Sequence, residues 1–144
     1  MPPKAQQQTT AELAHELRET VGRVIRRLRA EPGPPVPQLT VLARLDREGP
    51  ASVSDLAAVE RMRPQSMAQT VRDLERAGLV SRRPDPDDGR RVFVELTADG
   101  LAALNATRAR REGRLTEALE SELDASEREL LRDALALLRR IADA

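Results

Sequence analysis

The segment that decides the fold is residues 52–97, SVSDLAAVERMRPQSMAQTVRDLERAGLVSRRPDPDDGRRVFVELT. Its pattern predicts a short helix at 55–60, a tight turn, and a second helix at 64–77. Two segments with β-strand character, 79–83 and 91–97, then flank the loop PDPDDGR. Two helices joined by a turn and followed by a hairpin predict a winged helix-turn-helix.

The second helix of this segment has an apolar face and a polar face. At about 100° per residue, Val71 and Leu74 fall within about 40° of Met67, and these three side chains are expected to face the core. The opposite side carries a polar stripe, named here the reading stripe, made of Gln65, Gln69, Arg72 and Arg76. Glutamine pairs with adenine and arginine with guanine in the major groove, so the reading stripe suits base readout. An ordinary solvated helix face has a similar composition.

Two hydroxyl residues of the same helix are also candidate DNA contacts. Ser66 lies near the amino end, where free backbone N–H groups favour a phosphate, and Thr70 is expected at the edge of the site.

The loop between the two β segments predicts a hairpin tip that carries charge. An arginine at such a tip can enter a narrow minor groove, and a neighbouring carboxylate can hold its guanidinium in position. Arg90 with Asp88 is the pair expected to act in this way, and Arg91 belongs to the predicted DNA-binding set with them. A solvated turn rich in turn-forming residues is the alternative interpretation. The spacing of the acidic residues does not fit a calcium-binding EF-hand.

The chain on both sides of this lobe is predicted to be helical and apolar on one face. In 9–30 the apolar residues recur in steps of three and four, and near the C-terminus they form a face too wide for a lone surface helix. Such faces require a partner, so we expect a homodimer. The predicted organisation is one domain, 9–144, after a disordered tail at 1–8. It divides into a winged helix-turn-helix lobe at 36–97 and dimerisation helices at 9–30 and 98–144.

Most predicted helices begin at a residue that favours a helix start. Thr10, Ser54, Thr97 and Ser126 are candidate N-caps, because a side-chain oxygen can accept a hydrogen bond from a free backbone N–H group. Pro64 suits the first helical position, since its missing donor costs nothing there. The fold class predicted from these elements is mainly α with a small β-hairpin wing.

The composition of the 144 residues excludes several classes of function. The chain has no cysteine, which excludes disulfides, thiolate zinc sites and thiol redox chemistry. The sequence has a single histidine, and it contains neither a glycine-rich phosphate-binding loop nor a nucleophile elbow. It therefore offers no set of catalytic residues, no cofactor site and no metal site that can be named. We therefore expect a protein that is not an enzyme.

Charge and hydropathy indicate the compartment and the partner. The 24 basic residues balance the 24 acidic ones, so only the local distribution of charge favours nucleic acid. Basic residues exceed acidic ones by three between Arg61 and Arg91. No apolar run approaches the length of a membrane span, and no export signal precedes the first helix, so we expect a cytoplasmic protein.

Three motifs carry a resemblance to a known family. They are SVSDLA at 52–57, RPQSMAQTVRDLERAGLV at 63–80 and DPDDGRRVFVELTADG at 85–100, of which the last is the most specific. In these motifs, and in nearly its whole length, the chain resembles the MarR (multiple-antibiotic-resistance regulator) family of bacterial transcription factors. The resemblance implies a homodimer on a pseudo-palindromic operator, with recognition helices in successive major grooves and wings in the flanking minor grooves.

The resemblance also implies roles for particular residues. Carried over by motif position, Gln65, Ser66, Gln69 and Arg72 match the base and phosphate readers of the family, and Asp88 and Arg90 match the wing pair. Arg63 departs from the pattern, because a small capping residue is common at its position.

The resemblance further implies a transcriptional repressor that a small aromatic or anionic effector releases from DNA. The residues give little support for a particular ligand, because Phe93 is the one aromatic residue that could stack on it. The ligand-binding residues are therefore unknown. His15 is interpreted as an exposed helix residue, although it or the arginines of the first helix could meet an anion. The alternative function is a winged-helix module for protein contact, or an architectural DNA-binding module without a ligand.

Overall fold

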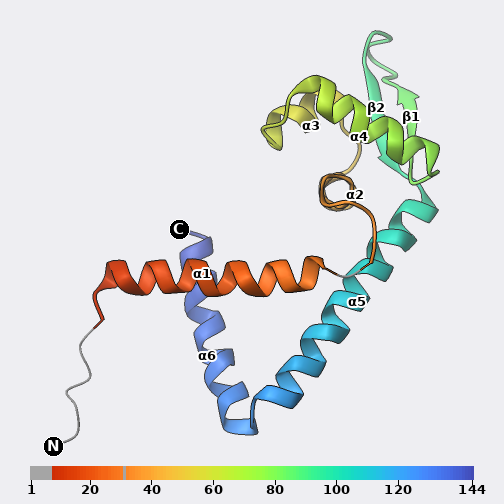
Figure 1. Ribbon diagram of the computed structural model, residues 1–144. Helices are drawn as coiled ribbons and strands as arrows, with labels where there is room; N and C mark the ends of the chain where they lie inside the picture. Colours follow the sequence, from red (N-terminus) through yellow and green to blue (C-terminus); the bar gives the residue numbers. More distant parts are fainter. Residues whose placement is uncertain (1–7, 31) are drawn as a thin grey trace, which may run out of the picture. The chain divides into compact units, whose positions relative to one another are not determined.

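The computed structural model describes residues 8–30 and 32–144, which form six helices and one two-stranded hairpin (Figure 1). In chain order the elements are α1 Thr10–Arg29, α2 Val36–Glu48, α3 Val53–Val59, α4 Pro64–Arg76, β1 Val80–Pro84, β2 Val92–Leu96, α5 Ala98–Glu122 and α6 Ala125–Ala142. A mainly helical winged helix-turn-helix with helical flanks was the predicted fold class, and it is confirmed. The predicted tail at 1–8 lies, except for Gln8, outside the described residues.

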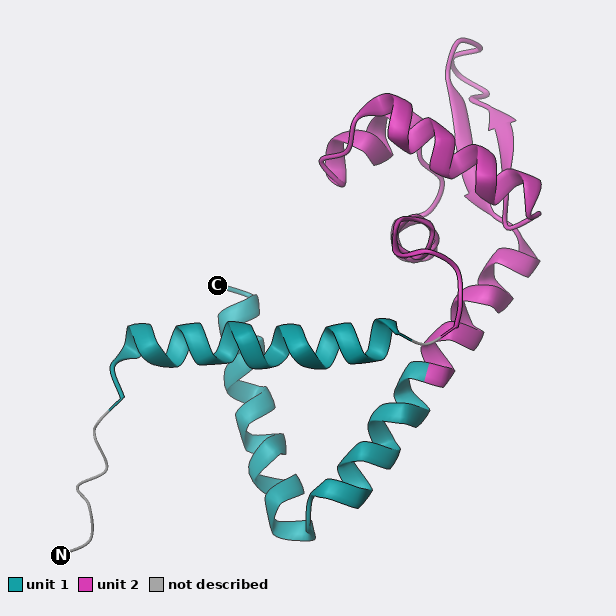
Figure 2. Ribbon diagram, viewed as in Figure 1, with its two compact units in different colours: residues 1–31, 111–144 teal, residues 32–110 magenta. Residues whose placement is uncertain are grey.

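The chain divides into two compact units (Figure 2). The first consists of Met1–Glu31 and Arg111–Ala144, and the second of Pro32–Arg110. The first part of α5 therefore belongs to the second unit, which extends beyond the lobe predicted at 36–97. Among the described residues, no helix combines the length and the hydropathy needed to span a bilayer.

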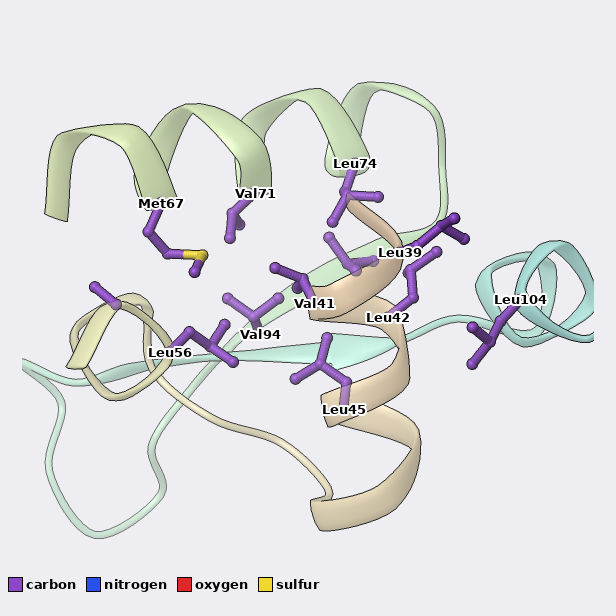
Figure 3. Close-up of a cluster of buried hydrophobic side chains, with 12 residues drawn as sticks. Leu39, Val41, Leu42, Leu45, Leu56, Met67, Val71, Leu74, Val94 and Leu104 are labelled. Atoms are coloured by element: carbon purple, nitrogen blue, oxygen red, sulfur yellow. The ribbon is translucent and has the colours of Figure 1, made fainter. Parts of the chain in front are cut away.

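The core of the second unit lies where α2, α3, α4 and the hairpin meet (Figure 3). Met67, Val71 and Leu74 of α4 point toward α2 and the hairpin, and each is fully buried. This confirms the predicted inward face of α4. The other fully buried side chains of this core are Val41, Leu42, Leu56 and Val94. Complete burial of an aliphatic side chain contributes about 1.5 to 3 kcal/mol, so these contacts fix the orientation of α4.

The hairpin pairs β1 with β2 in antiparallel register, from Val80 opposite Leu96 to Pro84 opposite Val92. Ala51 adds an isolated bridge to Val94, with backbone hydrogen bonds of 3.1 and 2.8 Å in the two directions. The short segment before α3 thus holds the hairpin against the helix-turn-helix.

The junction between the hairpin and α5 is tightly built. Thr97 Oγ1 accepts a hydrogen bond from the Gly100 N–H at 3.0 Å and donates one to the Gly78 carbonyl at 2.7 Å. Thr97 therefore caps α5, as predicted. A Cβ atom at Gly100 would lie 2.0 Å from the Leu79 carbonyl oxygen, so only glycine fits at this crossing.

Three of the predicted N-caps were wrong by one or two residues. α1 is capped by Thr9, α3 by Ser52 and α6 by Asp124, in place of Thr10, Ser54 and Ser126. Thr9 and Asp124 each form a capping box, in which the glutamate three residues later accepts a hydrogen bond from the backbone N–H of the cap.

The helices of the first unit keep large apolar side chains in solvent. On α6, Leu130 is 70% exposed, Leu137 56% and Ile141 63%, and on α1 Leu13 is 55% exposed. We name these two surfaces the α1 apolar face (Leu13, Val21, Val24 and Ile25) and the α6 apolar face (Leu130, Leu131, Leu135, Leu137 and Ile141).

Candidate nucleic-acid interface

The reading stripe lies on the solvent side of α4. Because Met67, Val71 and Leu74 hold the opposite face in the core, Gln65, Gln69, Arg72 and Arg76 are all exposed. The structure thus brings the four residues of the stripe together on one face, as their spacing predicts.

Hydrogen bonds along α4 orient part of the reading stripe. Arg72 donates to Gln69 Oε1 at 2.9 Å, and Gln69 Nε2 donates to Asp73 Oδ1 at 2.9 Å. Arg76 lies 3.6 Å from the same Asp73 oxygen. Exposed pairs of this kind contribute only about 0.2 to 0.5 kcal/mol each, so they can exchange for contacts to DNA. Asp73 is the one acidic residue in this network, and it was not among the predicted site residues.

The two hydroxyl residues of α4 differ in their availability. Ser66 is exposed in the first turn of the helix, where an anion would meet free N–H groups. Thr70 is half-buried, and its hydroxyl donates to the Ser66 carbonyl at 3.1 Å. Thr70 is therefore occupied within the helix in the free protein.

The tip of the hairpin is shaped by its own carboxylates. Asp85 Oδ1 accepts from the Asp87 N–H at 2.8 Å, and Asp88 Oδ1 accepts from the Arg90 N–H at 3.0 Å. The contact between Asp88 and Arg90 is thus to the backbone of Arg90. In the described part of the chain, no carboxylate pairs with the Arg90 guanidinium, which remains exposed at the tip. Asp88 acts on the turn, and the turn positions Arg90.

Arg91 is bound within the protein. Its guanidinium donates to Asp55 Oδ2 at 2.5 Å and lies 5.5 Å from the centre of the Phe93 ring. Arg83 lies 5.4 Å from the centre of the same ring and pairs with Glu95 at 2.9 Å. Arg91 therefore connects the loop end of the hairpin to α3, a function that its position in the sequence does not reveal.

Hydrogen bonding with Ser52, and then with Arg91, lowers the pKa of the Asp55 carboxyl from its ordinary value. A carboxyl with a lowered pKa stays ionised at neutral pH, and its stabilising contribution is lost only as the pH falls below about 4. Both groups of the Asp55–Arg91 pair are thus charged at neutral pH.

A hollow of about 480 Å³ lies between the start of α3 and the loop end of the hairpin. Its walls include the guanidinium-bearing residues Arg82, Arg90 and Arg91, together with the first residues of α3 from Ser52 to Asp55. Arg82 and Arg91 pair with Glu75 and Asp55. Arginine forks match phosphate geometry, so among the described residues of this hollow Arg90 is the one that can meet a phosphate without breaking an ion pair.

The fold and this surface define a class of protein: a winged helix-turn-helix with an exposed polar recognition helix and a basic wing tip. The MarR family model matches residues 35–92. An HTH-type transcriptional regulator of Mycobacterium tuberculosis is 39% identical over 136 residues, which cover 92% of this chain and 94% of that protein. The chain belongs to the MarR family and is a DNA-binding transcriptional regulator.

Two further relatives were found. A crystal structure of a transcriptional regulator protein from Pseudomonas aeruginosa has a TM-score of 0.84 and 43% identity, covering 93% of this chain and 96% of that one. The HTH-type transcriptional repressor NicR of Pseudomonas putida is 34% identical over 109 residues, which cover 74% of this chain and 65% of NicR. The family consists of transcriptional regulators and not of enzymes.

Proposed function

We propose that this protein is a cytoplasmic repressor that binds a pseudo-palindromic operator as a homodimer. The observation that carries the proposal is the exposure of the reading stripe on a helix whose other face is locked in the core. Base-reading side chains on a rigid helix provide sequence specificity, and Arg90 at the wing tip adds a contact to the flanking groove.

Homodimerisation is supported by the α1 and α6 apolar faces. Contiguous exposed leucines and isoleucines on two helices are unfavourable in water and mark an association surface. A two-fold dimer would also present two copies of α4 to half-sites about one helical turn apart. Leu137→Glu should therefore shift the mass in solution toward that of a monomer. Val59→Glu is a matched control, since Val59 is 51% exposed on α3, outside both faces.

Repression is supported by the name of the relative NicR, a transcriptional repressor. A dimer on an operator that overlaps a promoter excludes polymerase. A reporter driven by a promoter that contains the operator should be silenced by the wild-type protein, and the Gln69→Ala variant should relieve silencing. Increased expression with the wild-type protein would instead identify an activator.

We further propose that an aromatic or anionic effector releases the protein from DNA. A hollow of about 420 Å³ in the first unit is lined by apolar Val24, Leu28 and Leu115. Its charged residues are Arg27, Arg114 and Glu117, so cations exceed carboxylates by one, which favours an apolar anion. Benzoate and its hydroxylated derivatives should raise the melting temperature and displace labelled DNA. The Arg27→Gln variant should lose both effects. A higher melting temperature without displacement of the labelled DNA would show that the compound binds the protein but does not release it from DNA.

Selection of duplexes from a random-sequence library by the full-length protein tests the central part of the proposal. We expect convergence on a two-fold symmetric sequence. Retention of DNA without convergence would favour an architectural module, and absence of binding at low salt would favour a module for protein contact.

A further inference from the structure

Some arginines of the second unit are paired with a carboxylate of the same chain, and others are not. Most of them are neutralised within the chain, for example Arg44 by Glu60, Arg82 by Glu75 and Arg108 by Asp46. Within the described residues of the second unit, three guanidinium groups have no ion pair, hydrogen bond or ring contact: those of Arg61, Arg63 and Arg90. In the described part of the second unit, unpaired cations thus lie at two places, the wing tip and the turn between α3 and α4.

The turn contains two of these cations, and no side chain of the described chain offsets their repulsion. Arg61 and Arg63 are both exposed. The nearest carboxylate in the sequence is that of Glu60. Its side chain is only 18% exposed and forms an ion pair with Arg44 at 2.5 Å, so its charge is already neutralised. The first turn of α4 carries no acidic residue either. We name Arg61 and Arg63 the turn pair.

Arg61 also occupies an unfavourable backbone conformation. Its φ of +52° is the one positive value at a non-glycine residue among the described residues. A left-handed conformation costs a residue with a Cβ about 1 to 2 kcal/mol, and glycine or asparagine would reduce this cost. The protein nevertheless has an arginine there, and within the described residues its side chain makes no hydrogen bond, ion pair or ring contact that offsets the cost. This favours a role for the side chain outside the chain itself.

The position of the turn relative to α4 indicates the partner. The turn lies at the amino end of α4, and the hairpin lies beside the other end of that helix (Figure 1). Cations therefore lie on the turn at the amino end of the reading stripe and on the wing loop, which borders the start of α3. Because DNA carries one negative charge per about 1.7 Å of helix axis, a recognition helix seated in the major groove has phosphates at both of its ends.

We propose that Arg61 and Arg63 bind backbone phosphates of the operator at the amino end of α4, in addition to the contact made by Arg90. This inference rests on the proposed DNA-binding mode and adds two residues to it. Phosphate contacts set the register of a protein on the duplex and carry no base information. The turn pair thus fixes where α4 enters the groove, and the reading stripe then distinguishes the bases.

The test is fluorescence anisotropy of full-length variants on two duplexes, the library-selected sequence and a scrambled sequence of equal length, across a salt series. Arg61→Gly removes the side chain and suits the positive φ, and Arg63→Gln keeps most of the length without the charge. The matched control is Arg47→Gln, an exposed arginine of α2 that lies 3.8 Å from Glu48. The α2 helix packs on the core side of α4, away from the reading stripe (Figure 3).

Loss of one phosphate contact lowers the salt slope by about 0.9 and the affinity by about eightfold at 0.1 M salt. We expect this loss for each variant of the turn pair, by the same factor on both duplexes, and recovery of most of the affinity in Arg61→Lys. Affinities equal to those of Arg47→Gln would overturn the inference, and a loss confined to the selected duplex would show base contacts instead. Absence of binding by the wild-type protein would overturn the DNA-binding mode itself.

Discussion

Gln69 donates a hydrogen bond from Nε2 to Asp73 Oδ1 at 2.9 Å, one turn further along α4. Together with the bond from Arg72 to Gln69 Oε1, this fixes which side of the Gln69 amide donates and which side accepts. Asp73 also places a negative charge beside the helix face that we propose to enter the groove. It therefore has two opposing effects, orientation of a base-reading amide and repulsion of phosphates.

The Asp73→Asn variant separates these two effects. Asparagine can still accept the hydrogen bond from Gln69 but carries no charge, so binding should tighten on every DNA sequence. A unit charge a few ångströms away in water is worth about 1 kcal/mol, or roughly fivefold in affinity. Anisotropy on selected and scrambled duplexes measures the change. Asp73→Ala, which also removes the acceptor, should gain less on the selected duplex than on the scrambled one. Equal gains would exclude the orienting role.

The Gln69→Ala variant should lose specificity more than affinity. If Gln69 pairs with a base through both amide atoms, its removal costs about 1 to 3 kcal/mol on the selected duplex and little on random DNA. Competition between the two duplexes measures this difference. A similar loss on both duplexes would instead make Gln69 a phosphate contact.

Arg90 and Arg91 should behave differently despite their adjacency. Arg90→Ala should weaken DNA binding and lower the salt slope by about one, without changing thermal stability, because its guanidinium has no partner in the described chain. Arg91→Ala should act through the loss of the Asp55 contact. Asp55→Asn should then reproduce its effects on melting temperature and on affinity. A weaker affinity in Arg91→Ala alone would show that Arg91 itself contacts DNA.

Gly100→Ala should destabilise the second unit strongly. The new Cβ would meet the Leu79 carbonyl oxygen at 2.0 Å, and a backbone atom cannot move aside as a flexible side chain can. Overpacking costs about 1 to 3 kcal/mol and occasionally more, which corresponds to a fall in melting temperature of several degrees. Gly113→Ala in the same helix is the control, since its Cβ would meet nothing within 4 Å. It should stabilise the helix, and a similar fall in both variants would contradict the packing argument.

Local patterns were the part of the fold that could be predicted. The inward face of α4 follows from a period of 3.6 residues, and the complete burial of Met67, Val71 and Leu74 confirms it. The cap of α3 was misplaced because Ser52 and Ser54 are equally good N-caps by residue type. The cap of α6 had a signal that was missed, since Asp124 and Glu127 have the spacing of a capping box.

Contacts between distant residues were beyond prediction from one sequence. The Asp55–Arg91 pair joins residues 36 positions apart, and its formation depends on how the hairpin folds back on α3. In the wing, Asp88 and Arg90 are in contact, but through the backbone of Arg90 rather than its guanidinium. The isolation of Arg61 and Arg63 is also a three-dimensional property, because it depends on Arg44 holding Glu60.

The most direct test of the account compares the specificity of the wild-type protein with that of a Gln65→Ala, Gln69→Ala and Arg72→Ala triple variant. The quantity to measure is the ratio of the Kd on scrambled DNA to the Kd on the selected duplex at physiological salt. We expect a wild-type ratio of about 10³ or more, and a fall toward one in the variant while binding to scrambled DNA is largely retained. A wild-type ratio near one, or a ratio that the three substitutions leave unchanged, would contradict the assignment of α4 as the element that reads DNA sequence.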